Sequence, residues 1–282
     1  MNTIHPNHFD RMYSEFNNPN GRVMVIAHRG DWLNAPENTV PAIINAIDLG
    51  VDMIEIDVRR TRDGKLILMH DETVDRMTSG SGAVAELSYD ELLSLQVKQS
   101  EGGESAELTG VHIPTLEEVM KLVKGKALIN LDKCWDIREE VYQVLLDTGT
   151  VNHGLFKSDA ELDEVAAFLE SKAIRPEYMQ IIQASNAYLL HDPDALLTRI
   201  KPKAVEFVFE DETSPFSIEE SFHMFSGKCR LWINTMWDSL CAGHSDEQSL
   251  ENAADGWGWG IARGVNMIQT DYSRQLLNYL QK

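Results

Sequence analysis

The chain has few cysteines and no long apolar run, and each shortage excludes a class of protein. With only 3 cysteines in 282 residues, a disulfide framework is excluded, and Cys134, Cys229 and Cys241 are expected to be free thiols. No stretch approaches the roughly 20 apolar residues that a transmembrane helix needs. The segment from Met1 to Phe16 is polar and lacks the apolar core of a signal peptide.

Positive charge is also scarce. The 25 lysines and arginines are outnumbered by 45 acidic residues, which gives a formal net charge of −20. Without a basic stripe the chain is not expected to bind nucleic acid, and without a basic or apolar membrane-facing stripe we expect no stable membrane insertion. The sequence as it stands predicts a cytoplasmic protein, or a periplasmic or secreted one if a signal peptide was trimmed. It leaves the oligomeric state open.

Short apolar runs that lead into polar residues predict strands of a parallel sheet. Such runs are typical of buried strands, and ligand sites in parallel α/β folds lie at the C-terminal ends of the strands. Side chains two apart on a strand share a face, so Glu55 and Asp57 are expected to project together. The first three runs are residues 23–27 before His28, residues 53–58 with Glu55 and Asp57, and residues 66–69 before His70.

The paired carboxylates and the two histidines indicate a particular chemistry. Two carboxylates that point the same way from an apolar strand repel each other and lose hydration, and a divalent cation removes both penalties. Oxygen ligands favour Mg²⁺ or Ca²⁺, and no cysteine–histidine cluster has zinc spacing. A single His or Glu-x-Asp is more often structural. Together they are the inventory for metal-assisted cleavage of a phosphate ester.

From His28 to about Leu95 the chain resembles the glycerophosphodiester phosphodiesterase family. The resemblance implies a TIM barrel and divalent-metal-dependent hydrolysis of glycerophosphodiesters to glycerol phosphate and an alcohol. It is carried by HRG at 28–30, PENT at 36–39, EIDV at 55–58, TRDG at 61–64, HD at 70–71 and GSG at 80–82, and returns in LWIN at 231–234 and IQTD at 268–271.

The length agrees with one (β/α)₈ barrel, which typically needs about 250 residues. We therefore predict a single domain over residues 1–282, with a small insertion at 71–111, after the third strand, as a lid over the barrel mouth. Six later strand candidates bring the total to nine for eight places, so one is an extra strand or an error. They are residues 127–131, 154–157, 179–183, 204–209, 231–234 and 266–269.

Helix signals lie between these strands. Residues 39–49 carry apolar side chains at helical spacing and stop at Gly50. Thr115 opens a capping-box pattern, Ser158 is predicted to open another helix, and residues 88–95 predict a short helix inside the insertion.

The resemblance implies one divalent cation, Mg²⁺ or Ca²⁺, held by Glu55, Asp57 and Asp132. Asp132 lies in Asn-Leu-Asp-Lys-Cys, where the family usually has N-x-E-x-K, and it would remain a hard oxygen ligand. The cation would bind one non-bridging phosphate oxygen while Arg29 holds another with paired N–H donors.

Proton transfer is assigned to the histidines. One of His28 and His70 would act as the base and the other as the acid, because the histidine pKa lies near working pH. The sequence leaves open which does which, and whether the nucleophile is water or a glycerol hydroxyl that forms a cyclic phosphate. Glu37 is expected to support the site, with capping of the next helix as an equal alternative.

The family's phosphate-binding lysine is replaced here by Cys134. If the strand stayed regular, Asn130, Asp132 and Cys134 would share a face and Lys133 would point away. A strand end or bulge at Lys133 would turn that lysine inward, and Lys157, at the end of the next strand, is the other candidate. We favour Lys133 over Lys157.

The resemblance also suggests that Trp232 and Asn234 wall the substrate pocket. Three functions remain open: the phosphodiesterase of this family, a related phosphodiesterase resembling sphingomyelinase D that acts on lysophospholipid or sphingomyelin head groups, and a non-catalytic barrel that only binds. The acidic chain argues against the second, and the intact histidines and carboxylate pair argue against the third.

Overall fold

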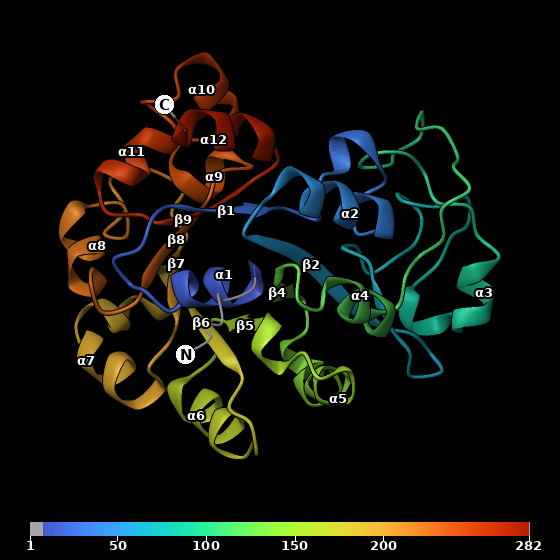
Figure 1. Cartoon of the computed structure of the whole chain (residues 1–282), viewed down its shortest axis with the longest axis horizontal. Coiled ribbons are helices and arrows are strands. Elements are labelled where there is room, and N and C mark those ends of the chain that lie inside the picture. Colours follow the sequence, from blue (N-terminus) through green and yellow to red (C-terminus); the bar gives the residue numbers. More distant parts are fainter. Residues whose placement is uncertain (1–7, 282) are drawn as a thin grey trace, which may run out of the picture.

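The computed structural model describes residues 8–281 and confirms the barrel (Figure 1). Eight parallel strands follow the order β1-β9-β8-β7-β6-β5-β4-β2, and pairing of β1 with β2 closes the sheet. The barrel strands are β1 (Met24–Ala27), β2 (Met53–Arg60), β4 (Leu128–Asp132), β5 (Gly154–Ser158), β6 (Glu177–Ile182), β7 (Ala204–Phe207), β8 (Arg230–Asn234) and β9 (Met267–Thr270).

The ninth strand, β3 (Leu66–Leu68), lies outside the barrel. It pairs antiparallel with the C-terminal end of β2, as a hairpin in which Val58 faces Leu68. The expectation that residues 66–69 form the third parallel strand is therefore wrong, and β3 is the extra strand among the nine candidates. The insertion consequently follows the second barrel strand rather than the third.

The predicted helices form close to their expected bounds. Gly50 ends α2 with a φ of +81°, and Thr115 caps α4 through a complete capping box. Ser158 does not open α6, since it belongs to β5, and Glu161 is the N-cap. The helices are α1 (His8–Phe16), α2 (Val40–Leu49), α3 (Tyr89–Leu93), α4 (Leu116–Val123), α5 (Arg138–Thr148), α6 (Leu162–Glu170), α7 (Pro193–Ala195), α8 (Glu219–Phe225), α9 (Asp238–Cys241), α10 (Asp246–Glu251), α11 (Trp257–Ala262) and α12 (Ser273–Leu280).

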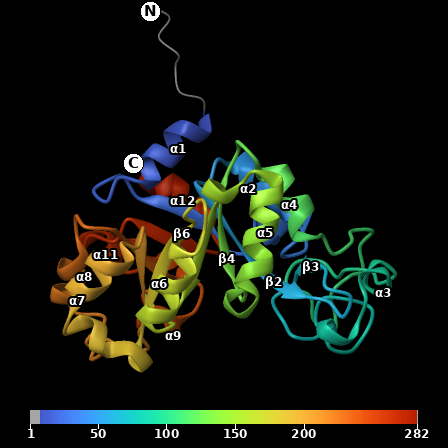
Figure 2. The same ribbon diagram turned by 90° about the horizontal axis from the view of Figure 1, so that it is seen from below.

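The barrel interior is apolar at one end and polar at the other. Inward side chains at the N-terminal ends of the strands form one apolar cluster, which Met12 and Phe16 of α1 complete. Figure 2 shows α1 at this end of the barrel and α9 at the opposite end. The polar inward positions lie toward the C-terminal ends of the strands, so the chemistry is confined to the end away from α1.

Residues 71–111 pack around a small core of their own. Val74, Met77, Val84 and Leu92 are buried together with side chains from β3 and its flanks. The segment projects to one side of the barrel, beyond β2 (Figure 2). Its role as a lid remains a prediction.

Two further findings concern membrane-spanning helices and the cysteine thiols. None of the helices within residues 8–281 combines the length and apolar character needed to span a membrane. Cys134, Cys229 and Cys241 are buried free thiols, as predicted.

His153 gives a testable link between pH and stability. Its ring stacks on Phe9 of α1 at 3.9 Å, and its Nε2 accepts a hydrogen bond from the Gly125 N–H at 2.9 Å. Burial, helped by the Lys124 charge, lowers the pKa of His153 from 6.5 to about 4. The unfolded chain thus binds the proton more tightly, so the histidine's contribution is complete above pH 6.5 and is lost as the pH falls toward 4.

We expect this histidine to lower the free energy of unfolding by about 1–2 kcal/mol between pH 7 and pH 4, allowing for its partial exposure. Urea unfolding of His153→Gln should show a smaller loss over that range than the unmodified protein. Exposed His223 provides the matched His223→Gln control. Equal losses in all three proteins would assign the acid sensitivity to other groups.

Candidate active site

Three carboxylates from neighbouring strands converge inside the polar end of the barrel. Glu55 and Asp57 share one face of β2, and Asp57 lies directly across from Asp132 of β4. One oxygen from each lies within 4.8 Å of the others. The predicted geometry of this acidic triad is therefore confirmed, although its use as a metal site stays a prediction.

The crowding of these charges shows in their pKa values. Burial, followed by the charges of Asp57 and Asp132, raises the pKa of Glu55 well above its ordinary value. The pKa of Asp132 shifts the other way: burial raises it, but the Lys157 charge, the hydrogen bonds from the Lys133 N–H and Lys157, and the Lys133 charge together outweigh burial and lower it. The oxygen-only donor set and the repulsion around Glu55 fit a hard divalent cation.

Unusual backbone conformations gather around the triad. Among the described residues six non-glycine residues have positive φ, and three of them, Arg29, Asn38 and Lys133, lie at this site. Asn38 donates from Nδ2 to Asp57 Oδ2 at 2.8 Å, and the Arg29 N–H donates to Glu55 Oε2 at 3.0 Å. A left-handed backbone is strained in a residue other than glycine and persists only where surrounding contacts hold it. Such residues cluster at functional sites.

Gly30 makes the turn at Arg29 possible. Its φ is +82°, and a Cβ added there would lie 2.8 Å from the backbone carbon of Ala42. Only glycine allows β1 to approach α2 this closely while the preceding side chains turn toward the triad.

His28 follows β1 and is held by Asp271, which follows β9. The His28 Nδ1 lies 2.7 Å from Asp271 Oδ1, which also accepts a 2.7 Å hydrogen bond from Trp32 Nε1. The other ring nitrogen, Nε2, lies 4.0 Å from Glu55 Oε2. Asp271 thus fixes the ring so that Nε2 faces the site.

His70 follows β3 and has a similar partner. Its Nδ1 lies 2.7 Å from Asp71 Oδ1, and Arg76 donates to both oxygens of Asp71 at 2.8 and 3.0 Å. Arg59 donates to the His70 carbonyl at 2.8 Å. Burial lowers the pKa of His70.

Glu37 connects the barrel to the insertion. Its two oxygens accept hydrogen bonds from Arg29 at 2.8 Å and from Arg76 at 2.6 Å. The N-cap of α2 is Thr39 instead, so Glu37 does not cap that helix. A buried carboxylate between two arginines supports the position of both.

The two candidate lysines both line the cavity, but one is buried in ion pairs and the other is exposed. Lys157 is buried, with Nζ 3.0 Å from Asp132 Oδ2 and 3.4 Å from Glu206 Oε2. Lys133 is exposed, and its φ of +56° breaks the alternation, as a strand end predicts. Cys134 does not take the position of the family's lysine, because β4 has ended and its side chain joins the core outside the barrel.

The expectation that Trp232 walls the pocket is wrong. Its side chain is fully buried in the apolar interior, from where Nε1 donates to Asn234 Oδ1 at 2.8 Å. Asn234 does line the cavity. The aromatic wall is provided by Trp237, which is 48% exposed and lies edge-on to His28 at 5.4 Å.

The cavity over the triad has a volume of about 380 Å³ and is lined by both histidines, Arg29 and both lysines. A neighbouring hollow of about 370 Å³ lies between Trp237 and the insertion and shares Arg29 and His70. Together they place the predicted groups around one accessible space.

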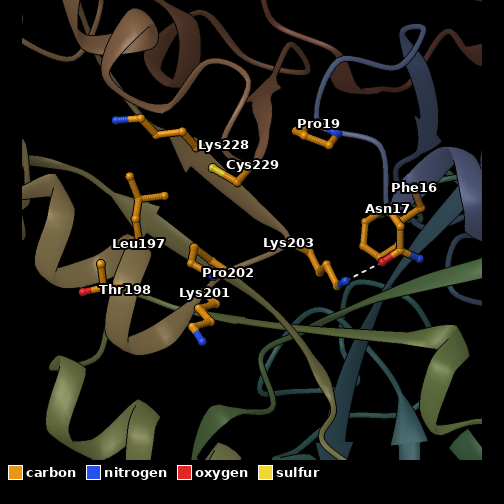
Figure 3. Close-up of a pocket in the computed structure, with 10 residues that line it drawn as sticks. All are labelled: Phe16, Asn17, Pro19, Leu197, Thr198, Lys201, Pro202, Lys203, Lys228 and Cys229. Atoms are coloured by element: carbon orange, nitrogen blue, oxygen red, sulfur yellow. Dashed lines mark hydrogen bonds between the residues drawn. The ribbon is translucent and has the colours of Figure 1, made fainter.

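A larger hollow, of about 620 Å³, lies at the α1 end and carries no such chemistry. It is lined by Phe16 and Asn17 and by three lysines. Figure 3 shows Lys203 reaching toward Asn17, while Lys201 and Lys228 point in other directions. Its charges do not converge on one point, so the candidate site is the cavity over the triad.

Sequence reasoning gave no role to Asp271, Arg76, Trp237 or Glu206. Asp271 is the last residue of the IQTD run at 268–271, and a carboxylate directly after a strand is the signal that could have identified it. No local sequence pattern marks Arg76, Trp237 or Glu206 as site residues. Packing of the strands and loops brings them to the cavity.

Comparison with known proteins adds independent findings. The sequence pattern of the glycerophosphoryl diester phosphodiesterase family matches residues 28–208, and a domain of unknown function matches residues 178–280. The chain is 46% identical over 112 residues to a glycerophosphodiester phosphodiesterase from Caldanaerobacter subterraneus, a match that covers 39% of this chain and 45% of that protein. With mouse glycerophosphodiester phosphodiesterase 1 it shares 41% identity over 102 residues, or 36% of this chain and 30% of the other. The chain thus spans half or less of the length of these relatives.

Solved structures support the fold. A glycerophosphoryl diester phosphodiesterase from Parabacteroides distasonis superposes with a TM-score of 0.74 at 22% identity, over 98% of this chain and 92% of the other. An Oleispira antarctica phosphodiesterase, solved with the product sn-glycerol-3-phosphate, gives a TM-score of 0.64 at 20% identity, over 92% and 97% of the two chains. At these identities the likeness establishes the barrel alone.

Proposed function

The chain belongs to the glycerophosphoryl diester phosphodiesterase family, and from this premise we propose that it hydrolyses glycerophosphodiesters to glycerol phosphate and an alcohol. The observation that carries the proposal is the convergence of the acidic triad, two histidines and Arg29 on one cavity. Each group supplies what cleavage of a phosphodiester monoanion requires.

Glu55, Asp57 and Asp132 would hold one Mg²⁺ or Ca²⁺ ion, since all three offer hard oxygen ligands. Bound there, the cation supplies positive charge that stabilises the phosphate oxygens in the transition state. Arg29, fixed by Glu37, would donate to another phosphate oxygen. These charges offset the overall acidity of the chain, which otherwise repels an anionic substrate.

His28 and His70 would move the protons. Each ring is fixed at Nδ1 by a carboxylate, Asp271 for His28 and Asp71 for His70. Both Nε2 atoms are therefore left for the substrate, one to accept a proton from the nucleophile and the other to donate one to the leaving alkoxide.

The direct test is turnover by the purified protein with Mg²⁺ or Ca²⁺. Glycerophosphocholine, -ethanolamine, -inositol and -glycerol would be assayed for release of glycerol phosphate. We expect at least one to be hydrolysed, while sphingomyelin and lysophosphatidylcholine are not. No turnover of any glycerophosphodiester under either metal would refute the proposal.

A separate prediction concerns which of Lys133 and Lys157 contacts the phosphate. Buried Lys157 already pairs with Asp132 and Glu206, whereas no described residue forms a hydrogen bond or ion pair with the Lys133 ammonium. The lysine that contacts phosphate should, when changed to methionine, weaken transition-state binding by about 1.5–3 kcal/mol, or 10- to 150-fold in kcat/KM.

Lys133→Met and Lys157→Met would be compared on one glycerophosphodiester, with exposed Lys228→Met as the control. We expect a large loss for Lys157 whether or not it contacts phosphate, because its removal leaves Asp132 and Glu206 without their cation. Lys133 is still the favoured phosphate contact, so Lys133→Met should also lose activity on the scale given above. Neutral results for both would leave Arg29 and the cation as the only contacts.

A further inference from the structure

The wall of the cavity opposite the acidic triad carries three buried polar side chains that the mechanism above does not use. They are Glu206 of β7, Asn234 of β8 and Gln269 of β9, and each is less than 5% exposed. All three line the cavity. Asn234 lies across from Gln269 in the β8–β9 register, so the set spans three adjacent strands.

Asn234 is held by the protein at both ends of its amide. Trp232 Nε1 donates to its Oδ1 at 2.8 Å, and its Nδ2 donates to Glu206 Oε1 at 2.6 Å. This chain of hydrogen bonds begins in the apolar interior and ends on one oxygen of Glu206. It therefore orients the carboxylate and leaves the other oxygen, Oε2, for the cavity.

Two acceptors on this wall have no hydrogen-bond donor among the described residues: Glu206 Oε2 and Gln269 Oε1. A buried acceptor left without a donor destabilises the folded protein, and more so when it is charged. The nearest cation, Lys157 Nζ, is 3.4 Å from Glu206 Oε2 and already pairs with Asp132. A ligand that brings hydrogen-bond donors would remove this cost.

A phosphate group is not that ligand, because its negative charge would face the Glu206 carboxylate. A hydroxyl group is suitable, since it donates to one neighbour and accepts from another. Glu206 and Gln269 offer the acceptors, and Lys157 offers a donor 3.4 Å from Glu206 Oε2. A vicinal diol carries two hydroxyl donors, one for each acceptor.

We propose that Glu206 and Gln269 form the subsite that receives the glycerol hydroxyls of the substrate. The proposal rests on the proposed function, which supplies a substrate with a glycerol end. It makes Glu206 and Gln269 substrate-contacting residues and makes Trp232 and Asn234 positioning residues behind them. The substrate then lies with phosphate toward Arg29 and the triad and with glycerol toward β7 and β9.

The test measures binding rather than turnover. Isothermal titration in the presence of Mg²⁺ would compare sn-glycerol 3-phosphate with propyl phosphate, which lacks both hydroxyls. We expect the unmodified protein to prefer glycerol 3-phosphate by about tenfold or more, the value of one hydrogen bond to a charged group. Glu206→Gln and Gln269→Met should each reduce this preference severalfold, and Glu170→Gln, on the exposed end of α6, should retain it.

Three results would overturn the assignment. Equal weakening of both ligands in Glu206→Gln would mean that Glu206 acts only by holding Lys157. No preference in the unmodified protein would mean that the hydroxyls bind elsewhere. Phosphoethanolamine serves as a third ligand. If Glu206→Gln weakened its binding but left glycerol 3-phosphate binding unchanged, the subsite would belong to the ammonium group of the leaving alcohol. If instead the protein turned over no glycerophosphodiester yet kept the Glu206-dependent preference, the proposed function would fail while the diol subsite stood.

Discussion

Removing the divalent cation is expected to abolish hydrolysis, and Mg²⁺ or Ca²⁺ is expected to restore it. Glu55, Asp57 and Asp132 place three carboxylate oxygens within 4.8 Å, and this concentrated negative charge cannot stabilise an anionic transition state by itself. Dialysis against EDTA followed by titration with each metal is the measurement. Full activity after exhaustive chelation would remove the metal from the mechanism.

Glu55→Gln gives the same prediction a readout that does not depend on turnover. Burial and two neighbouring carboxylates raise the pKa of Glu55, so in the metal-free protein its charge is costly. An uncharged glutamine removes that cost, and we expect the metal-free variant to unfold at the same or a higher temperature than the unmodified protein.

Metal should raise the Tm of the unmodified protein, because a ligand that binds only the folded state stabilises it by mass action. It should not raise the Tm of Glu55→Gln, and kcat/KM of that variant should fall by about 10³-fold. Glu251→Gln, an exposed change of the same kind on α10, serves as the control. An undiminished metal-dependent Tm shift in Glu55→Gln would place the ion elsewhere.

The acidic triad could be predicted because its information is local. The alternation along β2 puts Glu55 and Asp57 on one face whatever the rest of the fold does, and Asp132 ends a second apolar run. The same reasoning correctly allowed for a strand end at Lys133. It did not show that Cys134 would turn to the outer core, because that depends on where β4 stops.

The error at β3 has a clear physical origin. The sequence of an apolar run of three or four residues does not distinguish a barrel strand from a hairpin strand. The length of the connection was the available signal: β2 ends at Arg60 and β3 begins at Leu66, too short a span for the dozen or more residues of a parallel crossover. His70 still reaches the cavity, because the hairpin returns the chain to the C-terminal end of the barrel.

Trp232 shows what alternation cannot provide. The pattern correctly places Trp232 and Asn234 on the inward face of β8, but depth along a tilted barrel strand determines which layer each side chain joins. Trp232 falls in the apolar layer and Asn234 in the polar one. Partners such as Asp271, 243 positions away from His28, follow only from closure of the barrel.

Replacing His28 or His70 by alanine is expected to lower kcat by about 10²-fold or more, since each variant would lose one proton transfer. The variants should still fold, because each ring sits among polar groups at the barrel mouth and contributes little apolar packing. His28 contacts Asp271 and Glu55. Circular dichroism and urea unfolding would check the fold, and exposed His223→Ala would serve as the control.

A substrate with an activated leaving group can separate the two roles. A p-nitrophenyl phosphodiester releases p-nitrophenolate, a stable anion that needs no proton as it leaves. The variant that lacks the general acid should therefore recover most of its rate on that substrate. The variant that lacks the base should remain slow on both substrates, because activation of the nucleophile is unchanged by the leaving group. The structure provides the matched pair, since each ring is fixed through Nδ1 by a carboxylate at 2.7 Å.

The surroundings of the two carboxylates favour one assignment. Asp71 is neutralised by the two hydrogen bonds from Arg76, whereas the Asp271 side chain is met by the uncharged Trp32 N–H. Asp271 therefore places a negative charge beside the His28 ring, whereas burial lowers the pKa of His70 and favours its neutral, proton-accepting form. We expect His28 to be the acid and His28→Ala to be the variant that recovers with the p-nitrophenyl substrate. Recovery of His70→Ala instead would reverse the assignment, and near wild-type kcat in either variant would reduce that histidine to a structural role.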